Sequence, residues 1–140
     1  MKSIRLFFFL FTLTAVSFIS YGQQHSKQGK LSADYIFTEA QTEPQFKGGL
    51  FEWTRFITKN MGVPDSCTID DISHTMLVEF IVFKTGQVGK VKMLKGSPCM
   101  EKELIRIIEM SSGMWIPGRQ NNAFVNCYKK TPLIIHIGTQ

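Results

Sequence analysis

The chain has 140 residues, 44% of them hydrophobic, and its 16 lysines and arginines outnumber its 11 aspartates and glutamates. The resulting net charge of +5 is mild, and no basic cluster alternates with aromatic residues, so the composition argues against a nucleic-acid-binding protein. The length allows one domain with a single layer of helices on a sheet.

The N-terminus has the three parts of a secretory signal peptide. Lys2 and Arg5 form a basic start, residues 6–19 are almost wholly apolar, and Ser20-Tyr21-Gly22 precedes a cleavage position before Gln23. The apolar run of about fourteen residues is short for a membrane-spanning helix, which needs about twenty, so cleavage is favoured over an uncleaved anchor. We expect a signal peptide at residues 1–22, a polar leader with a short extended segment at 23–42, and a domain at 43–140.

An extended segment, a helix and a strand hairpin are predicted in the first half of the domain. Apolar residues recur at helical spacing from Leu50 to Ile57, and Pro64 ends the helix. Residues 75–83 are mostly apolar on both faces, which is typical of a covered central strand, and a turn with Gly86 at positive φ follows it. The expected ranges are an extended segment at 35–38, a helix at 50–60, a loop at 65–73, and strands at 75–83 and 88–94.

A second helix, from about residue 100 to residue 110, is expected to stop at a corner and pass directly into the last strand, residues 124–137. Trp115 can fill the seam between helix and sheet, Pro117 prevents the helix from continuing, and Gly118 relieves the turn. We interpret Trp115 as a core aromatic residue rather than a ligand platform, as we do Trp53 and Phe56.

This order of elements predicts an α+β fold, namely a small three-stranded antiparallel sheet with two helices packed on one face. The last strand would then be an edge, which agrees with Pro132, because a sheet tolerates proline only at an edge or a bulge. Lys129 and Lys130 are typical of an exposed edge strand. The unpaired backbone groups of such an edge can accept an extended peptide as an added strand.

Three cysteines follow the signal segment, and an exported chain meets an oxidising compartment. Cys67 and Cys99 both lie in predicted loops just outside strands, and they are the preferred disulfide pair. Cys127 lies inside the last strand and is interpreted as a buried small hydrophobic residue.

The sequence does not predict an enzyme. The three histidines lie far apart along the chain, and no spacing joins one of them to a cysteine as a catalytic dyad. Metal-ligand spacings and a phosphate-binding loop are also absent from the sequence, so we expect no catalytic residues, no metal and no cofactor. The histidines are His25, His74 and His136.

From Glu43 to Ile137 the chain resembles the C-terminal domain of TonB, the energy transducer of outer-membrane transport. The resemblance implies the fold given above and a class of partner, the short TonB-box peptides at the periplasmic end of outer-membrane transporters. The motifs that carry it are Pro44-x-Phe46-x-Gly48-Gly49, Phe56-x-x-x-Asn60-x-x-x-Pro64, Val78-x-Phe80-x-Val82 with Gly86 and Val88, Glu103-x-x-Arg106, Trp115-x-Pro117-Gly118, Val125 and Pro132-Leu133.

In that family the peptide adds beside the last strand, near the loop that ends the first helix. The resemblance therefore places the peptide ladder at Lys129, Thr131, Leu133 and Ile135, with Asn60, Val63 and Pro64 in the adjacent loop. The family pattern has tyrosine where this chain has Val63, glycine where it has His74, and a further glycine where it has Asn122-Ala123.

The sequence has no proline-rich spacer like that of a full TonB, so we expect a free-standing domain in the periplasm that binds TonB-box-type peptides of outer-membrane transporters. Extended at about 3.3 Å per residue, the leader from Gln23 to Glu43 reaches only about 70 Å. One alternative is a minimal energy transducer held in the inner membrane by its uncleaved signal, with ExbB and ExbD as partners. A second alternative is a homodimer in which strand exchange satisfies the edge.

Overall fold

The computed structural model describes residue 32 and residues 34–72 and 75–134, all within the unit Leu31–Gln140. The signal segment, residues 23–31 and 33 of the leader, His74, Ile135 and His136 lie outside the described residues, as does the last part of the predicted final strand.

The central strand of the sheet is β3 (Met76–Val82), which pairs antiparallel with β4 (Val88–Lys95) on one side and with β7 (Ala123–Leu133) on the other. On the far side of β7, β1 (Ile36–Phe37) pairs in parallel with Asn126 and Cys127. In line with β3, β6 (Gly118–Gln120) pairs with the start of β7. A separate pair joins β2 (Gln45–Phe46) to β5 (Trp115–Ile116).

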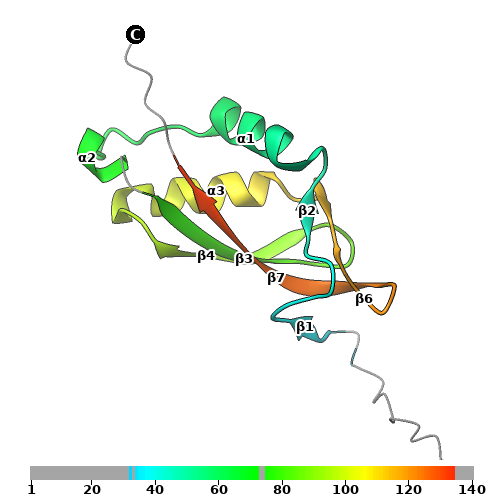
Figure 1. The fold of residues 1–140 in the computed structure, drawn as a ribbon. Helices are drawn as coiled ribbons and strands as arrows, with labels where there is room; N and C mark the ends of the chain where they lie inside the picture. Colours follow the sequence, from blue (N-terminus) through cyan, green and yellow to red (C-terminus); the bar gives the residue numbers. More distant parts are fainter. Residues whose placement is uncertain (1–31, 33, 73–74, 135–140) are drawn as a thin grey trace, which may run out of the picture. The chain divides into compact units, whose positions relative to one another are not determined.

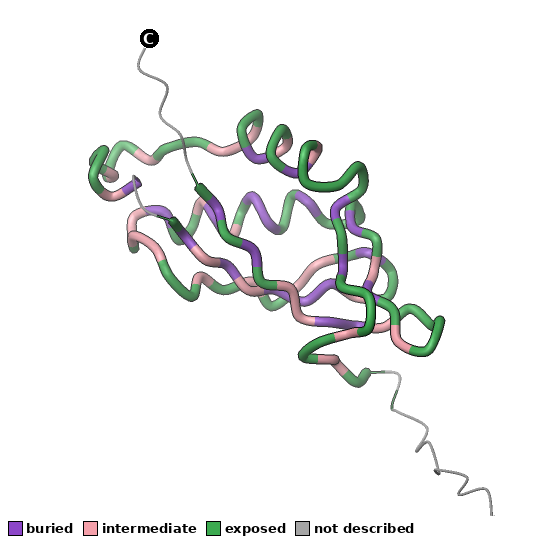
Figure 2. Tube along the Cα trace, in the orientation of Figure 1, coloured by how far each residue is buried: buried purple, intermediate pink, exposed green. Residues whose placement is uncertain are grey.

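The helices α1 (Gly49–Asn60) and α3 (Glu101–Met110) lie on the same face of the sheet, as Figure 1 shows. A short helix, α2 (Ile69–Ile72), precedes β3, and a 3-10 helix (Pro98–Met100) leads into α3. The buried positions of Figure 2 lie where these helices and the sheet face one another. The core there is built from Trp53 and Ile57 of α1, Leu104, Ile107 and Ile108 of α3, and Met76, Val78, Phe80 and Val82 of β3.

The α+β class predicted from the sequence is correct, but the number of elements is not. The main sheet of the described chain has five strands instead of three, and the predicted loop at 65–73 contains α2. Thr68 and Asp71 start this helix as a capping box, because the backbone N–H of each donates to the side chain of the other. β1 lies within the short strand or extended segment expected at 35–38. The strands that were not predicted, β2, β5 and β6, are two or three residues long, too short to show a hydrophobic period.

The predicted direct passage from the second helix into the last strand is wrong. After α3 the chain first adds β5 beside β2, then forms β6, and then turns back into β7. Asn121 and Asn122 make this turn with φ values of 49° and 64°, the left-handed conformation that two-residue hairpin turns require. Gly118 lies within β6 and not in a turn; a Cβ there would approach the carbonyl oxygen of Thr42 to 3.1 Å.

The other predicted turn is at the expected place. Gly86 has φ +83° in the β3–β4 hairpin, and a Cβ on it would lie 2.6 Å from the carbonyl oxygen of Trp115. The hairpin turn is therefore packed directly against the chain that follows α3, and glycine is required there for both reasons.

Cys67 and Cys99 form a disulfide, which is the pair preferred from the sequence, and their Cα atoms are 5.6 Å apart. The bridge joins the segment before α2 to the 3-10 helix, across 32 residues of chain. Cys127 is buried as a free thiol, and burial raises its pKa. The described residues thus contain one disulfide and one thiol shielded from exchange.

Candidate functional site

Along β7, the backbone N–H and C=O groups of successive residues point alternately toward β3 and away from it. In the β3–β4 hairpin the N–H of Phe83 donates to the carbonyl of Gln87 at 2.8 Å, so the backbone groups of Phe83 point toward β4. Alternation along β3 then turns the groups of Val82 and Phe80 toward β7. The register between β3 and β7 is regular, so the residues of β7 that point toward β3 are Cys127, Lys129, Thr131 and Leu133.

The backbone groups of Tyr128, Lys130 and Pro132 therefore point away from β3, toward the outer flank of β7. Pro132 fits this assignment because it has no N–H and would break a ladder bond at any inward-pointing position. The sequence-based placement of Lys129, Thr131 and Leu133 on an outer ladder is therefore wrong. Their backbone groups belong to the ladder with β3, and their side chains lie on the helix side of the sheet.

The outer flank of β7 is only partly open. β1 covers it at Asn126 and Cys127, so the prediction of a free edge along the whole strand fails at these two residues. Beyond Cys127, no strand among the described residues pairs with this flank. We call the outer flank of residues 128–132 the open edge of β7. It presents the N–H and C=O of Lys130 and the C=O groups of Tyr128 and Pro132.

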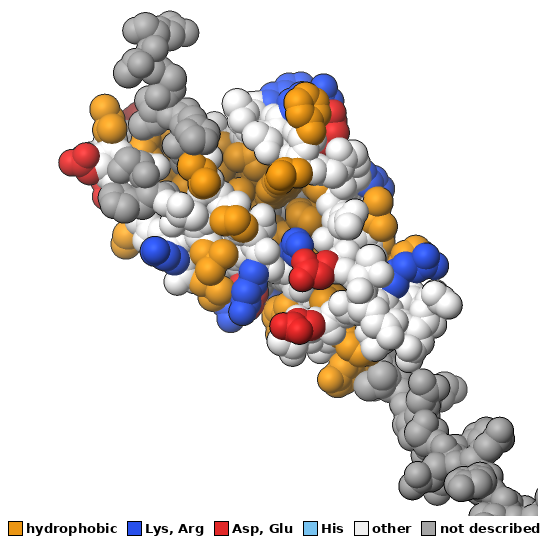
Figure 3. All heavy atoms as spheres, in the orientation of Figure 1, with side chains coloured by type: hydrophobic (Ala, Val, Ile, Leu, Met, Phe, Trp, Pro, Cys, Tyr) orange, Lys and Arg blue, Asp and Glu red, His pale blue; other side chains and the backbone are white. Residues whose placement is uncertain are grey.

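A groove of about 410 Å³ runs beside the open edge. Its other wall is formed by β2 and the start of α1, where Leu50 is 78% exposed. Figure 3 shows hydrophobic side chains gathered in a hollow on this face. Most of the lining residues are apolar or aromatic, and the polar exceptions are Gln45, Lys129, Lys130 and Thr131. The apolar and aromatic members include Pro44, Phe46, Leu50, Trp53, Trp115 and Pro132.

The floor of the groove is an aromatic cluster. The ring centroids of Trp53 and Trp115 are 5.2 Å apart, and Trp115 contacts Phe80 of β3 at 5.1 Å. Phe46 lies 5.2 Å from Trp53 and adds β2 to the cluster. The indole N–H of Trp115 donates to Ser111 Oγ at 2.9 Å, which satisfies its one polar group within the core. The floor is therefore a closely packed cluster that joins α1, β2, β3 and β5.

One end of the groove is marked by an ion pair. Lys129 Nζ donates to Glu43 Oε2 at 2.7 Å, and this hydrogen bond lowers the pKa of Glu43. On the far side of Lys129 lies a smaller hollow of about 280 Å³, into which Glu39 and Glu79 also project. The pair thus ties the chain between β1 and β2 to the middle of β7.

The loop residues predicted to border the peptide site lie elsewhere. Asn60 lines a different hollow, together with Phe56 and Met110. Val63 is 47% exposed and Pro64 half-buried, beyond the end of α1. The structure therefore brings Lys129 and Thr131 to the groove and leaves Asn60 out of it. Pro132, two residues after Lys130, was the signal in the sequence that could have identified the outward-pointing positions.

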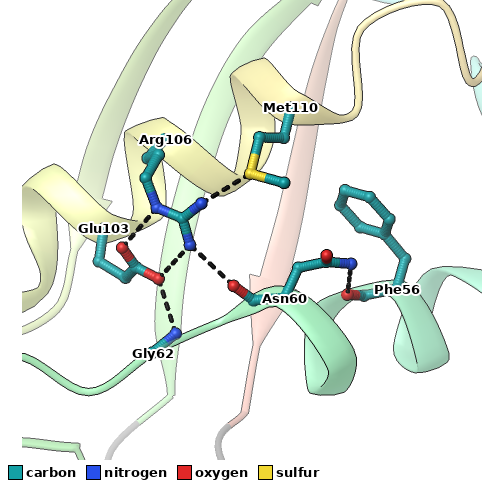
Figure 4. A network of polar contacts seen from close by, with 6 residues as sticks. All are labelled: Phe56, Asn60, Gly62, Glu103, Arg106 and Met110. Carbon is teal, nitrogen blue, oxygen red and sulfur yellow. Dashed lines mark hydrogen bonds and ion pairs between the residues drawn. The ribbon is translucent and has the colours of Figure 1, made fainter.

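Arg106 and Glu103 form a network that joins α3 to the end of α1 (Figure 4). Arg106 donates to both carboxylate oxygens of Glu103 and, at 2.7 Å, to the carbonyl of Asn60. Glu103 Oε1 also accepts from the N–H of Gly62 at 2.7 Å. The two side chains thus hold the last turn of α1 and so support the helix that forms one wall of the groove.

Replacing Glu103 by glutamine is expected to lower the free energy of unfolding by about 1 kcal/mol above about pH 5. The hydrogen bond from Arg106 lowers the pKa of Glu103 below its ordinary value of 4.5. A carboxyl group with a lower pKa in the folded chain stabilises the fold above its ordinary pKa, and this stabilisation is lost as the pH falls. Urea denaturation at pH 7 and pH 3 measures the difference, which should shrink at pH 3.

Glu109→Gln, an exposed change on the same helix, serves as the control and is expected to alter stability by less than about 0.5 kcal/mol. An equal loss for Glu103→Gln at both pH values would show that the Glu103 charge contributes nothing.

Among the described residues, no three histidine, cysteine, aspartate or glutamate side chains are placed to hold a metal ion. No helix within 34–72 or 75–134 is long and apolar enough to cross a membrane. Comparison with known proteins finds no family model, no curated protein and no solved structure that matches the chain.

Proposed function

We propose that this domain binds extended peptide segments by β-strand addition at the open edge of β7. The observation that carries the proposal is that the outer flank of Lys130, with which no described strand pairs, lies beside a largely apolar groove. Backbone hydrogen bonds would align the guest strand, and the groove would receive alternate side chains. Because each backbone bond contributes only about 1 kcal/mol net, a short guest is expected to bind weakly.

The resemblance to TonB C-terminal domains supports a natural guest of the TonB-box type, at the periplasmic end of an outer-membrane transporter. The signal-peptide pattern of residues 1–22 supports a periplasmic location. The proposed role is thus peptide binding in TonB-dependent transport, without catalysis. If the N-terminal segment is retained as an anchor, the same edge would serve a minimal energy transducer that contacts ExbB and ExbD.

A titration followed by NMR tests the proposal. The probe is a capped seven-residue peptide of alternating valine and threonine, added to the exported protein. The amide of Lys130 should shift strongly because it gains a hydrogen bond, whereas the amides of Lys129 and Thr131 already bond to β3 and should shift less. The same peptide with a central proline is the control and should cause little change. Absence of shifts in β7 at millimolar peptide would reject strand addition.

A homodimer is the second candidate, because the same open edge could pair with β7 of another copy about a two-fold axis. Sedimentation velocity over a range of concentrations separates the two candidates. A monomer that binds peptide supports the first, and a dimer that peptide cannot dissociate supports the second.

A further inference from the structure

The described residues that line the groove beside the open edge include two lysines and no carboxylate. The only charged residues that line the groove in the described structure are Lys129 and Lys130. Lys129 is paired with Glu43 at 2.7 Å. Lys130 lies 3.4 Å from Glu79, a carboxylate that is already bonded to Lys92 at 2.7 Å. One carboxylate therefore serves two lysines, and Lys130 is the more distant of them.

One row across the sheet contains Lys92, Glu79 and Lys130. Lys92 of β4 is the direct partner of Glu79 on β3, and Glu79 is the direct partner of Lys130 on β7. The charges alternate along the row, and the next position would be filled by the residue of a guest strand directly opposite Lys130. Directly opposite side chains share one face of a sheet, so that guest residue would lie beside the Lys130 ammonium group.

We infer that the guest is an extended segment in which an aspartate or glutamate lies between two apolar residues, an inference that rests on the strand addition proposed above. The central carboxylate would lie opposite Lys130 and extend the alternating row. The two flanking residues would lie opposite Lys129 and Thr131.

The two guest residues beside the central acid are expected to be apolar because side chains alternate between the two faces of a sheet. Lys129 and Thr131 are the direct partners of Phe80 and Val78, whose side chains lie in the core on the helix side of β3. Guest residues opposite Lys129 and Thr131 would point to the same side, into the groove above Trp53 and Trp115. Apolar side chains gain burial there, whereas polar ones would lose hydration without a partner.

Two other carboxylates lie near the open edge and bear on this selection. Glu43 is already bonded to Lys129. Glu39 lines the smaller hollow together with Lys130 and could compete with a guest carboxylate. If Glu39 already neutralised Lys130, a guest acid would gain nothing, and the experiment distinguishes this outcome.

The test compares four capped seven-residue peptides by NMR titration at low salt. Three have two valines around a central glutamate, glutamine or lysine, and the fourth has two serines around a central glutamate. We expect the glutamine peptide to bind about twofold to fivefold more weakly than the glutamate peptide, and the lysine peptide to bind weakest of the three. The serine peptide should lose about tenfold or more.

Lys130→Gln should remove the preference for glutamate over glutamine, and 0.5 M salt should reduce it in the unmodified protein. Lys95→Gln, at an exposed position on the opposite edge of the sheet, is the matched control and should leave the preference unchanged. Equal binding of the glutamate and glutamine peptides would overturn the inference while leaving strand addition intact. Failure of all four peptides to bind would instead reject the proposed function.

Discussion

Replacing Trp115 by alanine is expected to lower the free energy of unfolding by about 4 kcal/mol, because it removes a large buried aromatic side chain from the core. Trp115 is only 3% exposed and contacts Phe46, Trp53 and Phe80, so β2, α1 and β3 all lose packing together. Urea denaturation followed by circular dichroism measures the loss. A variant within about 1 kcal/mol of the unmodified protein would show that the cluster does not hold these elements together.

Two further variants separate packing from the hydrogen bond of the indole. Trp115→Phe keeps an aromatic ring but leaves the buried Ser111 hydroxyl without its donor, and we expect a loss of about 2 kcal/mol. Phe51→Ala removes an aromatic side chain that is 75% exposed on α1, and it should change stability by less than about 0.5 kcal/mol.

Proline at Thr131 and proline at Lys130 are expected to have very different effects, although the two positions are adjacent. Thr131→Pro removes an N–H that points toward β3 and should cost about 3 kcal/mol or more in stability. Lys130→Pro removes an N–H that points to the outer flank, and it should cost no more than about 1 kcal/mol. Denaturation of both variants tests the assignment, and equal losses would contradict it.

Lys130→Pro is expected to have a small effect on stability but a clear effect on peptide binding. Lys130→Pro should weaken binding of the valine–threonine peptide about fivefold, because the open edge loses the backbone N–H that donates to the guest. Lys130→Gln keeps the N–H and is the control for loss of the charge, so it should bind this neutral peptide normally. If Lys130→Pro remains folded and binds as well as Lys130→Gln, the guest does not lie on the open edge.

Several elements could be predicted from the sequence because their signals are local. The apolar stripe of α1, the two-sided apolar pattern of β3 and the glycine of its hairpin lie near their expected places. The preferred pair, Cys67 and Cys99, is joined as expected. Each of these signals depends on the spacing of neighbouring residues or on the chemistry of a residue type.

The sequence contained a signal for the outward-pointing residues of β7, but the prediction named the inward-pointing ones instead. Pro132 can occupy only an outward position, and alternation then places Lys130 outward with it. The family resemblance led instead to Lys129, Thr131 and Leu133, whose backbone groups point toward β3. The physical constraint on proline would have been the better guide.

By itself, the sequence determined the class of fold, the principal helices and the central hairpin, because hydrophobic periodicity and turn chemistry act over a few residues. Only the tertiary structure decided that β1 covers β7 at Asn126 and Cys127 and that β2 and α1 form a groove beside residues 129–132. Those contacts join segments about 90 residues apart, such as Ile36 and Asn126, and no local pattern in the sequence says which distant strand a short segment will join.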